Sequence, residues 1–478
     1  MLRKEEQYME KQIKKSTEKK TYPLTASQRL LWYAYQRCSK KSVLNVGTFL
    51  MIKYDIDEEV LSKAVSKAYD RCESMRIRFE KDGEHSLKQY VVAKDRRKAE
   101  YYDFSNMSFE EIDAKLSEWT CIPFNLYKKP LNRIVTLKMP DGFFGIYLLV
   151  NHLTMDAQSI ILFIRDVIEI YCSMQFDNVE FPKEMASYIE QLEKDLAYEH
   201  GNAASVRDAK FFEDMIKSSE PVFCGLEGMG KLNAEREKYG KDTRAATNVT
   251  GSFDAKIHVF HLEKEPSDVL MKFCEDYHVS MASLLLMGLR TYFQKFNYVD
   301  DVSIQSAIAR RATIKEKRSG GTRIHPFPCR TIIGRDKTFL EGLEIVREAQ
   351  NKLFRHANYD PVKYLNLRSE YYNLKPGQIY EPMSLTYQPL TLKDRGNLSL
   401  IGDIEYHSKW YSNGAAAQAL YLTVMHRADD NGLDFNFEYQ PDMVSEEMLK
   451  NFYYYICRIL FEAVKNPNRP IGEIQDNV

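Results

Sequence analysis

One short stretch of the chain carries side chains that can do acid-base chemistry. Residues 148–157 read Leu-Leu-Val-Asn-His-Leu-Thr-Met-Asp-Ala, which places His152 and Asp156 close together in sequence. An imidazole with an ordinary pKa of about 6.5 is largely a free base near neutral pH, so His152 can accept or position the proton of an attacking amine or hydroxyl. Asp156 can cap a helix that begins near Ala157.

The elements on either side of this stretch are suited to hold it. Residues 145–150 form an apolar run that is typical of a buried strand, and residues 158–171 have the apolar periodicity of a helix. A turn between two such elements has a fixed backbone and exposed side chains. The sequence therefore predicts a strand-turn-helix active site.

The rest of the chain predicts two successive mixed α/β units, which suggests two similar lobes. Strands are predicted at 46–54, 133–137 and 143–150, and then at 255–262, 302–309, 385–388, 420–424 and 433–439. Residues 218–255 lack a clear period and predict a long, mobile surface loop. We expect a disordered N-terminal extension over 1–21, a first lobe over 22–183 and a second over 184–478.

Composition excludes several classes of partner. The 67 Lys and Arg residues nearly cancel the 68 Asp and Glu residues, so there is no global basic field for nucleic acid. The 8 cysteines form no CxxC pair and no Cys/His cluster, which favours free thiols, no metal site and a cytoplasmic protein. No apolar run is long enough to span a bilayer, and no secretory signal is present.

Several stretches follow one another in an order that a known family shares. Residues 24–32, 71–79, 151–157, 327–330, 356–361 and 466–472 resemble, in this order, motifs of the condensation domains of nonribosomal peptide synthetases, within the chloramphenicol acetyltransferase-like superfamily. The stretch 151–157 is similar to the signature HHxxxDG, with Asn151 in place of the first histidine and Ala157 in place of the glycine. The resemblance runs nearly from end to end.

The resemblance implies a fold and an activity. The fold would be a V of two chloramphenicol acetyltransferase-like lobes with an active-site tunnel between them, the loop 311–325 forming its floor and part of 385–415 a latch between the lobes. The activity would be transfer of an acyl or peptidyl group from a carrier-protein phosphopantetheine thioester to an amine or hydroxyl acceptor. This reaction needs no permanently bound cofactor, and we expect a monomer.

The resemblance also assigns roles within the signature. His152 stands at the position of the catalytic histidine, as general base or positioning group. Asn151 stands at a chiefly structural position, where an amide can donate and accept hydrogen bonds but cannot titrate. Ala157 is harmless if its backbone φ is negative, and costly if the position needs positive φ or close approach to substrate.

Three further residues are implied by their place along the chain. The family's aspartate pairs with an arginine and holds the active-site loop, so Asp156 is expected to pair with Arg310, with Arg76 as second choice. Tyr387 and Gln388 fall on the strand that lines the family's tunnel, and either contact substrate or take part in ordinary strand packing.

The sequence leaves alternatives open. Gly320-Gly321 is followed by Thr322-Arg323, so no carrier-type serine is present, and no Gly-rich phosphate loop suggests adenylation. We therefore expect a free-standing domain that receives its donor from acyl- or peptidyl-carrier proteins in trans and passes it to a small-molecule acceptor. One alternative is an acyltransferase that uses acyl-CoA. Another is a catalytically degenerate domain that recruits partner proteins, which the residues at 151 and 157 keep open.

The basic side chains between 309 and 323 also have two interpretations. They form either a solvated loop or a patch for an acidic carrier domain or its phosphopantetheine arm.

Overall fold

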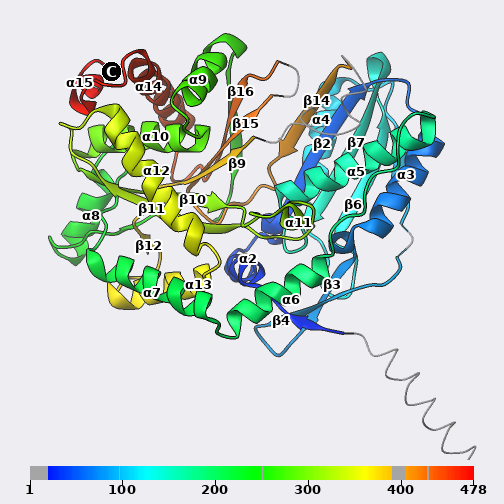
Figure 1. The fold of residues 1–478 in the computed structure, drawn as a ribbon, viewed down its shortest axis with the longest axis horizontal. Coiled ribbons are helices and arrows are strands. Elements are labelled where there is room, and N and C mark those ends of the chain that lie inside the picture. The colour runs from blue at the N-terminus through cyan, green and yellow to red at the C-terminus, as the bar shows by residue number, and fades with distance from the viewer. Residues whose placement is uncertain (1–19, 96, 250, 390–403, 428–429) are drawn as a thin grey trace, which may run out of the picture.

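Two sheets organise the chain, and both carry helices. The computed structural model describes residues 20–95, 97–249, 251–389, 404–427 and 430–478. Figure 1 shows one sheet formed mostly by the N-terminal third of the chain and a second one formed by the C-terminal half. This arrangement confirms the mixed α/β class. The predicted extension over 1–21 lies outside the described residues, apart from its last two positions.

The first sheet has the strand order β14-β2-β7-β6-β5. Helices α3 and α5 cover one face and α4 covers the other, so the central strand β7 is buried on both sides, which explains its uninterrupted apolar run. The elements are β2 (Asn45–Lys53), α3 (Glu58–Arg71), β5 (Glu100–Asp103), α4 (Phe109–Thr120), β6 (Asn132–Lys138), β7 (Phe143–Asn151), α5 (Ala157–Gln175) and β14 (Tyr406–Tyr411).

One strand of this sheet comes from far along the chain. β14 pairs antiparallel with the outer edge of β2, from Tyr406 opposite Ile52 to Tyr411 opposite Gly47. The Oγ1 of Thr48 lies 3.3 Å from the carbonyl oxygen of Lys409, 361 residues away. The resemblance predicts that part of 385–415 crosses between the lobes, and β14 crosses from the second half of the chain into the first sheet in this way. Residues 390–403 of that range lie outside the described residues.

The second sheet has the order β11-β10-β13-β15-β16-β9. Its strands alternate between apolar residues that face the helices and more polar residues on the other face. The elements are β9 (Lys256–Leu262), α9 (Lys264–Asp276), α10 (Met281–Asn297), β10 (Asp301–Ile308), α11 (Ile314–Lys317), β11 (His325–Ile332), α12 (Phe339–His356), α13 (Pro361–Tyr371), β13 (Ser384–Gln388), β15 (Leu420–His426), β16 (Leu433–Tyr439), α14 (Glu446–Lys465) and α15 (Ile471–Asp476).

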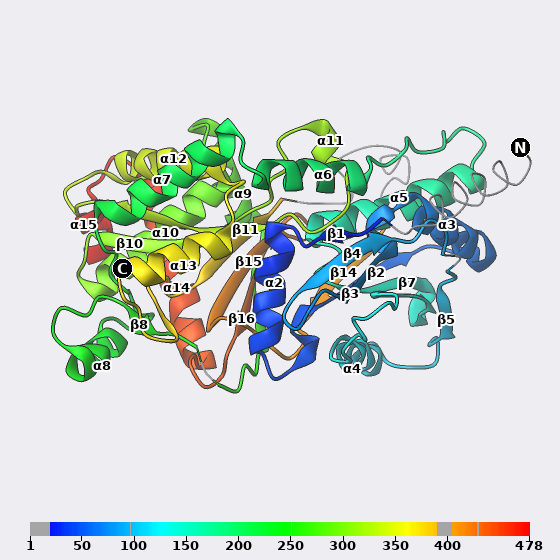
Figure 2. The same cartoon turned by 90° about the horizontal axis from the view of Figure 1, so that it is seen from below.

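The remaining elements lie between and around the two sheets (Figure 1 and Figure 2). Figure 2 shows α2 between them, where it contacts α13. Thr25 and Gln28 form a capping box that starts α2. β1, β4 and β3 form a small three-stranded sheet, and β12 and β8 form a two-stranded one. These elements are β1 (Tyr22–Pro23), α2 (Ala26–Arg37), β3 (Ile77–Lys81), β4 (Leu87–Val91), α6 (Tyr188–Glu199), α7 (Ala203–Ser218), α8 (Gly230–Tyr239), β8 (Ala246–Thr247) and β12 (Gln378–Ile379).

The prediction of a mobile loop over 218–255 is wrong. This segment contains α8 and the short strand β8, and Phe223, Leu226 and Leu232 are buried in the core of the C-terminal half. α8 is polar on nearly every side, so its sequence has no helical period to read. Residues 221–226 are buried as one run, and their partners in the core come from distant parts of the chain.

Candidate functional site

The predicted strand-turn-helix is present at residues 151–157. β7 ends at Asn151, and α5 begins at Ala157 with Asp156 as its N-cap, whose side chain accepts a hydrogen bond from the Ser159 N–H at 3.0 Å. The capping role weighed for Asp156 is therefore confirmed. His152 lies in the turn, one residue beyond the end of the buried strand.

Asn151 shapes this turn. Its Oδ1 accepts a hydrogen bond from the Leu153 N–H at 3.0 Å, and its carbonyl oxygen accepts from the N–H and the hydroxyl of Thr154, both at 2.8 Å. Its Nδ2 is buried and has no partner among the described residues. Side-chain to backbone bonds of this kind fix a turn without needing a titratable group.

Ala157 has an ordinary helical backbone. It is the first residue of α5 and is not among the described residues with positive φ. An alanine costs nothing in this conformation, so the absence of glycine does not strain the turn.

Asp156 is fully buried and forms an ion pair with Arg311. Arg311 Nη1 donates to Asp156 Oδ2 at 2.7 Å, and Nη2 donates to Oδ1 at 2.9 Å. Burial alone would raise the pKa of Asp156, but the Arg311 guanidinium and the backbone N–H groups of Ser159 and Arg323 hold this pKa below its ordinary value. The carboxylate stays ionised, so Asp156 holds the loop and does not exchange protons near neutral pH.

The predicted partner of Asp156, Arg310, is wrong by one residue. Arg310 has a left-handed backbone with φ 48. This turn at the end of β10 interrupts the alternation of side chains, so the next residue, Arg311, reaches Asp156. The Nε of Arg310 instead donates to the carbonyl oxygen of Arg323 at 3.0 Å. Arg76, the second choice, donates to backbone carbonyls elsewhere in the N-terminal part.

The loop between β10 and β11 closes under the turn. The carbonyl oxygen of Gly321 accepts hydrogen bonds from Arg311 Nη2 at 3.0 Å and from Ser159 Oγ at 2.6 Å. Gly321 has φ 100, and a Cβ at this position would lie 2.5 Å from the Tyr188 ring. Arg323 is buried as well, whereas Lys315 is exposed. The interpretation of the basic side chains between 309 and 323 as a solvated loop therefore holds only for the outer part of this segment.

His152 is held at the contact between the turn and this loop. Its backbone N–H donates to the Leu44 carbonyl oxygen at 2.6 Å, and its Nδ1 lies 3.4 Å from Thr322 Oγ1. Burial lowers the pKa of His152 below 6.5, while the charge of Asp156 opposes this shift. The imidazole is therefore neutral near pH 7. When Nδ1 carries the proton toward Thr322, Nε2 has the free lone pair that a general base needs.

The two residues predicted on β13 lie on opposite faces of the sheet. Tyr387 packs against the helix-covered core, as Leu385 does, and its hydroxyl lies 2.6 Å from His426 Nε2. Burial raises the pKa of Tyr387 to about 12. Gln388 points to the opposite face by strand alternation. The packing interpretation thus fits Tyr387, and substrate contact stays a prediction for Gln388.

Residues of the other motifs join the helices around the site. Arg29 pairs with Asp360 at 2.7 Å, which links the stretch 24–32 to the stretch 356–361. Arg71, which opens the stretch 71–79, pairs with Asp166 of α5 at 3.0 Å. These motifs therefore hold elements in place around the turn and do not themselves reach His152.

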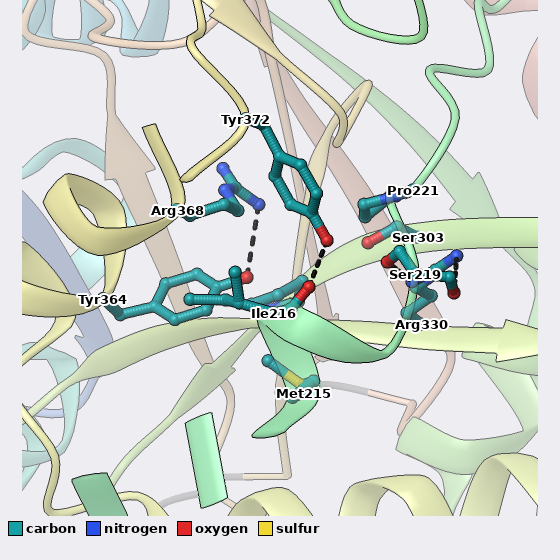
Figure 3. Close-up of a pocket in the computed structure, with 10 residues that line it drawn as sticks. Met215, Ile216, Ser219, Pro221, Ser303, Arg330, Tyr364, Arg368 and Tyr372 are labelled. Atoms are coloured by element: carbon teal, nitrogen blue, oxygen red, sulfur yellow. Dashed lines mark hydrogen bonds between the residues drawn. The ribbon is translucent and has the colours of Figure 1, made fainter. Parts of the chain in front are cut away.

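A small cavity lies elsewhere in the C-terminal half. Figure 3 shows it between α7, β11 and α13, with Tyr364, Arg368 and Tyr372 among the residues that line it. About 20 Å³ is available to water there, which accommodates one water molecule and no acyl chain. None of the predicted site residues lines this cavity.

The described part of the chain contains neither a metal-binding cluster nor a helix suited to span a membrane. No group of three or more His, Cys, Asp or Glu side chains there could hold a metal ion, and the 8 cysteines are all free thiols. None of the helices in that part combines the length and the apolar character that crossing a bilayer requires.

Local sequence could not identify the residues that complete the site. Arg311, Thr322 and Arg323 lie 155, 170 and 167 residues beyond the signature residues they contact. The only local signal was the pair Gly320-Gly321, which marks a backbone that must turn sharply.

Comparison with known proteins places the whole chain in one family. The family model of the condensation domain matches residues 18–476. Surfactin synthase subunit 2 of Bacillus subtilis (strain 168) is 23% identical over 473 residues, which cover 98% of this chain and 12% of that protein. Bacitracin synthase 3 of Bacillus licheniformis is 23% identical over 485 residues, which cover 97% of this chain and 7% of that protein. The chain thus spans less than a fifth of the length of these relatives.

Solved structures share the fold. The first condensation domain of the calcium-dependent antibiotic synthetase, in complex with a substrate analogue, matches with a TM-score of 0.76 and 19% identity, covering 95% of this chain and 98% of that one. The starter condensation domain of rhizomide synthetase, in complex with C8-CoA, matches with a TM-score of 0.78 and 17% identity, covering 95% and 96%. The chain therefore belongs to the condensation-domain family, the amide-forming acyltransferases of nonribosomal peptide synthesis.

Proposed function

We propose that this chain transfers an acyl or peptidyl group from the phosphopantetheine thioester of a carrier protein to an amine, with His152 as the group that receives the proton. The observation that carries the proposal is a neutral, partly buried imidazole at the end of β7, whose Nδ1 contacts Thr322 and whose backbone N–H donates to the Leu44 carbonyl oxygen. Membership of the condensation-domain family supports the same reaction class.

The residues divide the work between proton transfer and positioning. The acceptor nitrogen attacks the thioester carbonyl, a C–N bond forms and the C–S bond breaks; the nitrogen proton passes to Nε2 of His152 and from there to the departing thiolate, which leaves as the free thiol. The ion pair of Asp156 with Arg311 fixes the turn, so that the imidazole keeps one position during this transfer. A hydroxyl acceptor would give an ester by the same steps.

Acyl-CoA is a second candidate donor. The starter condensation domain of rhizomide synthetase, whose structure resembles this chain, was solved in complex with C8-CoA. A carrier thioester and acyl-CoA have the same phosphopantetheine arm, so the two donors differ only in what the arm is attached to. Supply of the carrier in trans, and a domain that stands alone, remain predictions.

One assay separates these possibilities. The purified protein is offered an acyl thioester on a carrier protein, on pantetheine and on CoA, each with amine and alcohol acceptors, and products are identified by mass. The matched variants are His152→Ala and His85→Ala, the second of which removes an imidazole whose side chain is 81% exposed. We expect amide product with the wild type and His85→Ala, and a rate at least about 100-fold lower with His152→Ala.

The outcomes assign the function. Product that His152→Ala forms at the wild-type rate would exclude His152 as the proton acceptor. Product from CoA but not from the carrier would identify the acyl-CoA enzyme. Binding of the carrier without product from any donor would favour a domain that recruits partners.

A further inference from the structure

Two asparagines beside the His152 turn have complementary polar groups left over. Asn45 is the first residue of β2 and Asn151 is the last residue of β7. Both are buried, with 2% and 1% of their surface exposed. The Oδ1 of Asn45, an acceptor, and the Nδ2 of Asn151, a donor, are buried and have no partner among the described residues. A buried amide group without a hydrogen bond costs free energy, so each group should have a partner close by.

The register of the first sheet places the two side chains next to each other. Asn45 lies directly opposite Asn151 in the antiparallel pairing of β2 with β7. The backbone bond from the His152 N–H to the Leu44 carbonyl oxygen belongs to the next pair of residues, so the two asparagines form a pair without backbone hydrogen bonds of its own. The Cβ atoms of such pairs are about 4.5–5.5 Å apart. Both side chains project toward α4, as that of Leu149 does.

The orientation of each amide is fixed by its other hydrogen bonds. Asn45 Nδ2 donates to the carbonyl oxygens of Thr120 and Ile122, at 2.8 Å and 2.7 Å, and only the nitrogen can do this. Asn151 Oδ1 accepts from the Leu153 N–H at 3.0 Å, and only the oxygen can do this. Exchanging oxygen and nitrogen in either amide would break these bonds. The groups left over are therefore one acceptor and one donor on adjacent side chains.

Asn45 is itself held by a distant segment of the chain. Asn413, which follows β14, donates through Nδ2 to the Asn45 carbonyl oxygen at 2.9 Å, and the Ser42 hydroxyl donates to the Asn413 carbonyl oxygen at 2.8 Å. Asn151 directly precedes His152 in the chain. A bond between the two asparagines would therefore tie the turn to β2, to the end of α4 and to the segment after β14.

We propose that Asn151 Nδ2 donates a hydrogen bond to Asn45 Oδ1, and that Asn45 is thereby a positioning residue for His152. The Cβ separation expected for this pair is within the span of two amides that share a hydrogen bond. With this bond the amide at 151 makes one donor and one acceptor contact, which a neutral histidine can also make. The positioning role rests on the proposed acyl transfer, in which His152 receives the proton; the hydrogen bond does not.

A double-mutant cycle tests the hydrogen bond. Asn151→Ala should raise the equilibrium constant of unfolding about tenfold less in Asn45→Ala than in the wild type, because the bond is already gone. The matched cycle combines Asn45→Ala with Asn132→Ala and should be additive. Asn132 is buried in the same sheet, but its register partner Val150 packs on the opposite face, and its Nδ2 donates to the Met75 carbonyl oxygen. Urea denaturation measures both cycles, and additivity of Asn45→Ala with Asn151→Ala would overturn the bond.

A crystal structure of the wild type tests the same bond without a variant. It should place Asn151 Nδ2 about 3 Å from Asn45 Oδ1. A separation above about 3.5 Å, or a different partner for either atom, would refute the bond.

The positioning role has its own readouts. Asn45→Ala should lower kcat for amide formation about tenfold and change KM for the thioester less than about twofold, because the turn moves while the binding surface remains. The pKa of His152, followed by NMR, should rise toward 6.5 as water reaches the ring. Asn132→Ala should leave kcat and this pKa unchanged, although it also removes a buried hydrogen bond. Equal effects of Asn45→Ala and Asn132→Ala on kcat and on this pKa would reduce Asn45 to a general support of the fold.

These measurements separate the inference from the proposed function. If the two asparagines are coupled and no donor gives product, the hydrogen bond stands and acyl transfer fails. If product forms and Asn45→Ala keeps the wild-type kcat, the positioning role is wrong and acyl transfer stands.

Discussion

The pKa of His152 depends more on withdrawal from solvent than on a charged neighbour. Withdrawal from solvent lowers its pKa, and the negative charge of Asp156 only partly restores it because Arg311 already neutralises that carboxylate. A histidine hydrogen-bonded directly to a free carboxylate would have the opposite shift. The proposed division between a proton-accepting histidine and a loop-holding aspartate is consistent with the electrostatics of the pair.

This arrangement predicts the titration of His152. Its imidazole signals, observed by NMR with labelled histidine and identified by their loss in His152→Ala, should titrate with a pKa below 6.5. Replacing Asp156 by Asn removes the opposing charge and should lower the pKa further. An apparent pKa of 6.5 or higher in the wild type would mean that water or charge reaches the ring, and would contradict the structure.

At the scale of elements, the loop between β10 and β11 depends on Arg311. Arg311→Met leaves the Asp156 carboxylate buried without a cation and should cost about 3–5 kcal/mol in the free energy of unfolding. The matched variant is Arg310→Met, which leaves this pair intact. Urea denaturation of both variants, each with and without Asp156→Asn, gives the coupling energies.

The coupling energy of Asp156 with Arg311 should be large, and that of Asp156 with Arg310 should be close to zero. Asp156→Asn should cost much less in the Arg311→Met background than in the wild type, because the partner is already gone, whereas its cost should be nearly unchanged beside Arg310→Met. The reverse result would restore Arg310 as the partner.

Gly321 offers a separate test of the same loop. Its φ of 100 and the ring of Tyr188, 2.5 Å from where a Cβ would stand, both oppose a side chain. Gly321→Ala should cost more stability than Gly201→Ala, where φ is 94 and nothing lies within 4 Å of the added atom. Thermal unfolding measures the difference. Equal losses would show that the contact with Tyr188 is relaxed at no cost and that only the backbone matters.

Sequence patterns predicted the elements with strong local signals. The strand β7 and the N-cap of α5 depend on neighbouring residues, and both were found where expected. The partner of Asp156 was missed because one left-handed residue, Arg310, shifts the register of its strand end, and no periodicity reports that. Thr322 was missed since only the tertiary fold brings it to His152.

At the scale of the whole molecule, the buried histidine His325 links the stability of the fold to pH. His325 is fully buried, its Nδ1 lies 2.8 Å from the Ala357 carbonyl oxygen, and its Nε2 has no partner among the described residues. Burial, followed by the positive charges of Arg310 and Arg323, lowers its pKa well below 6.5. The unfolded chain therefore binds a proton at a pH where the native protein does not.

The sign of the resulting pH dependence follows from this difference. As the pH falls below about 6.5, His325 favours the unfolded state, by up to about 1.4 kcal/mol per pH unit. His325→Gln should show a smaller loss of stability than the wild type between about pH 6.5 and pH 5, and His85→Gln, an exposed control, should follow the wild type. Urea denaturation across this range measures it. Parallel curves for all three proteins would mean that His325 protonates in the native state as readily as in the unfolded one.

The crossing of β14 into the first sheet has a consequence for how the protein is made. β2 and β7 emerge from the ribosome well before β14, so the outer edge of β2 has no strand beside it until residues 406–411 have been synthesised. An unpaired edge is a template for pairing with other chains, and it persists while most of the second half is translated. Completion of the first sheet thus waits for the synthesis of β14, and a chain stopped before β14 would leave that edge exposed.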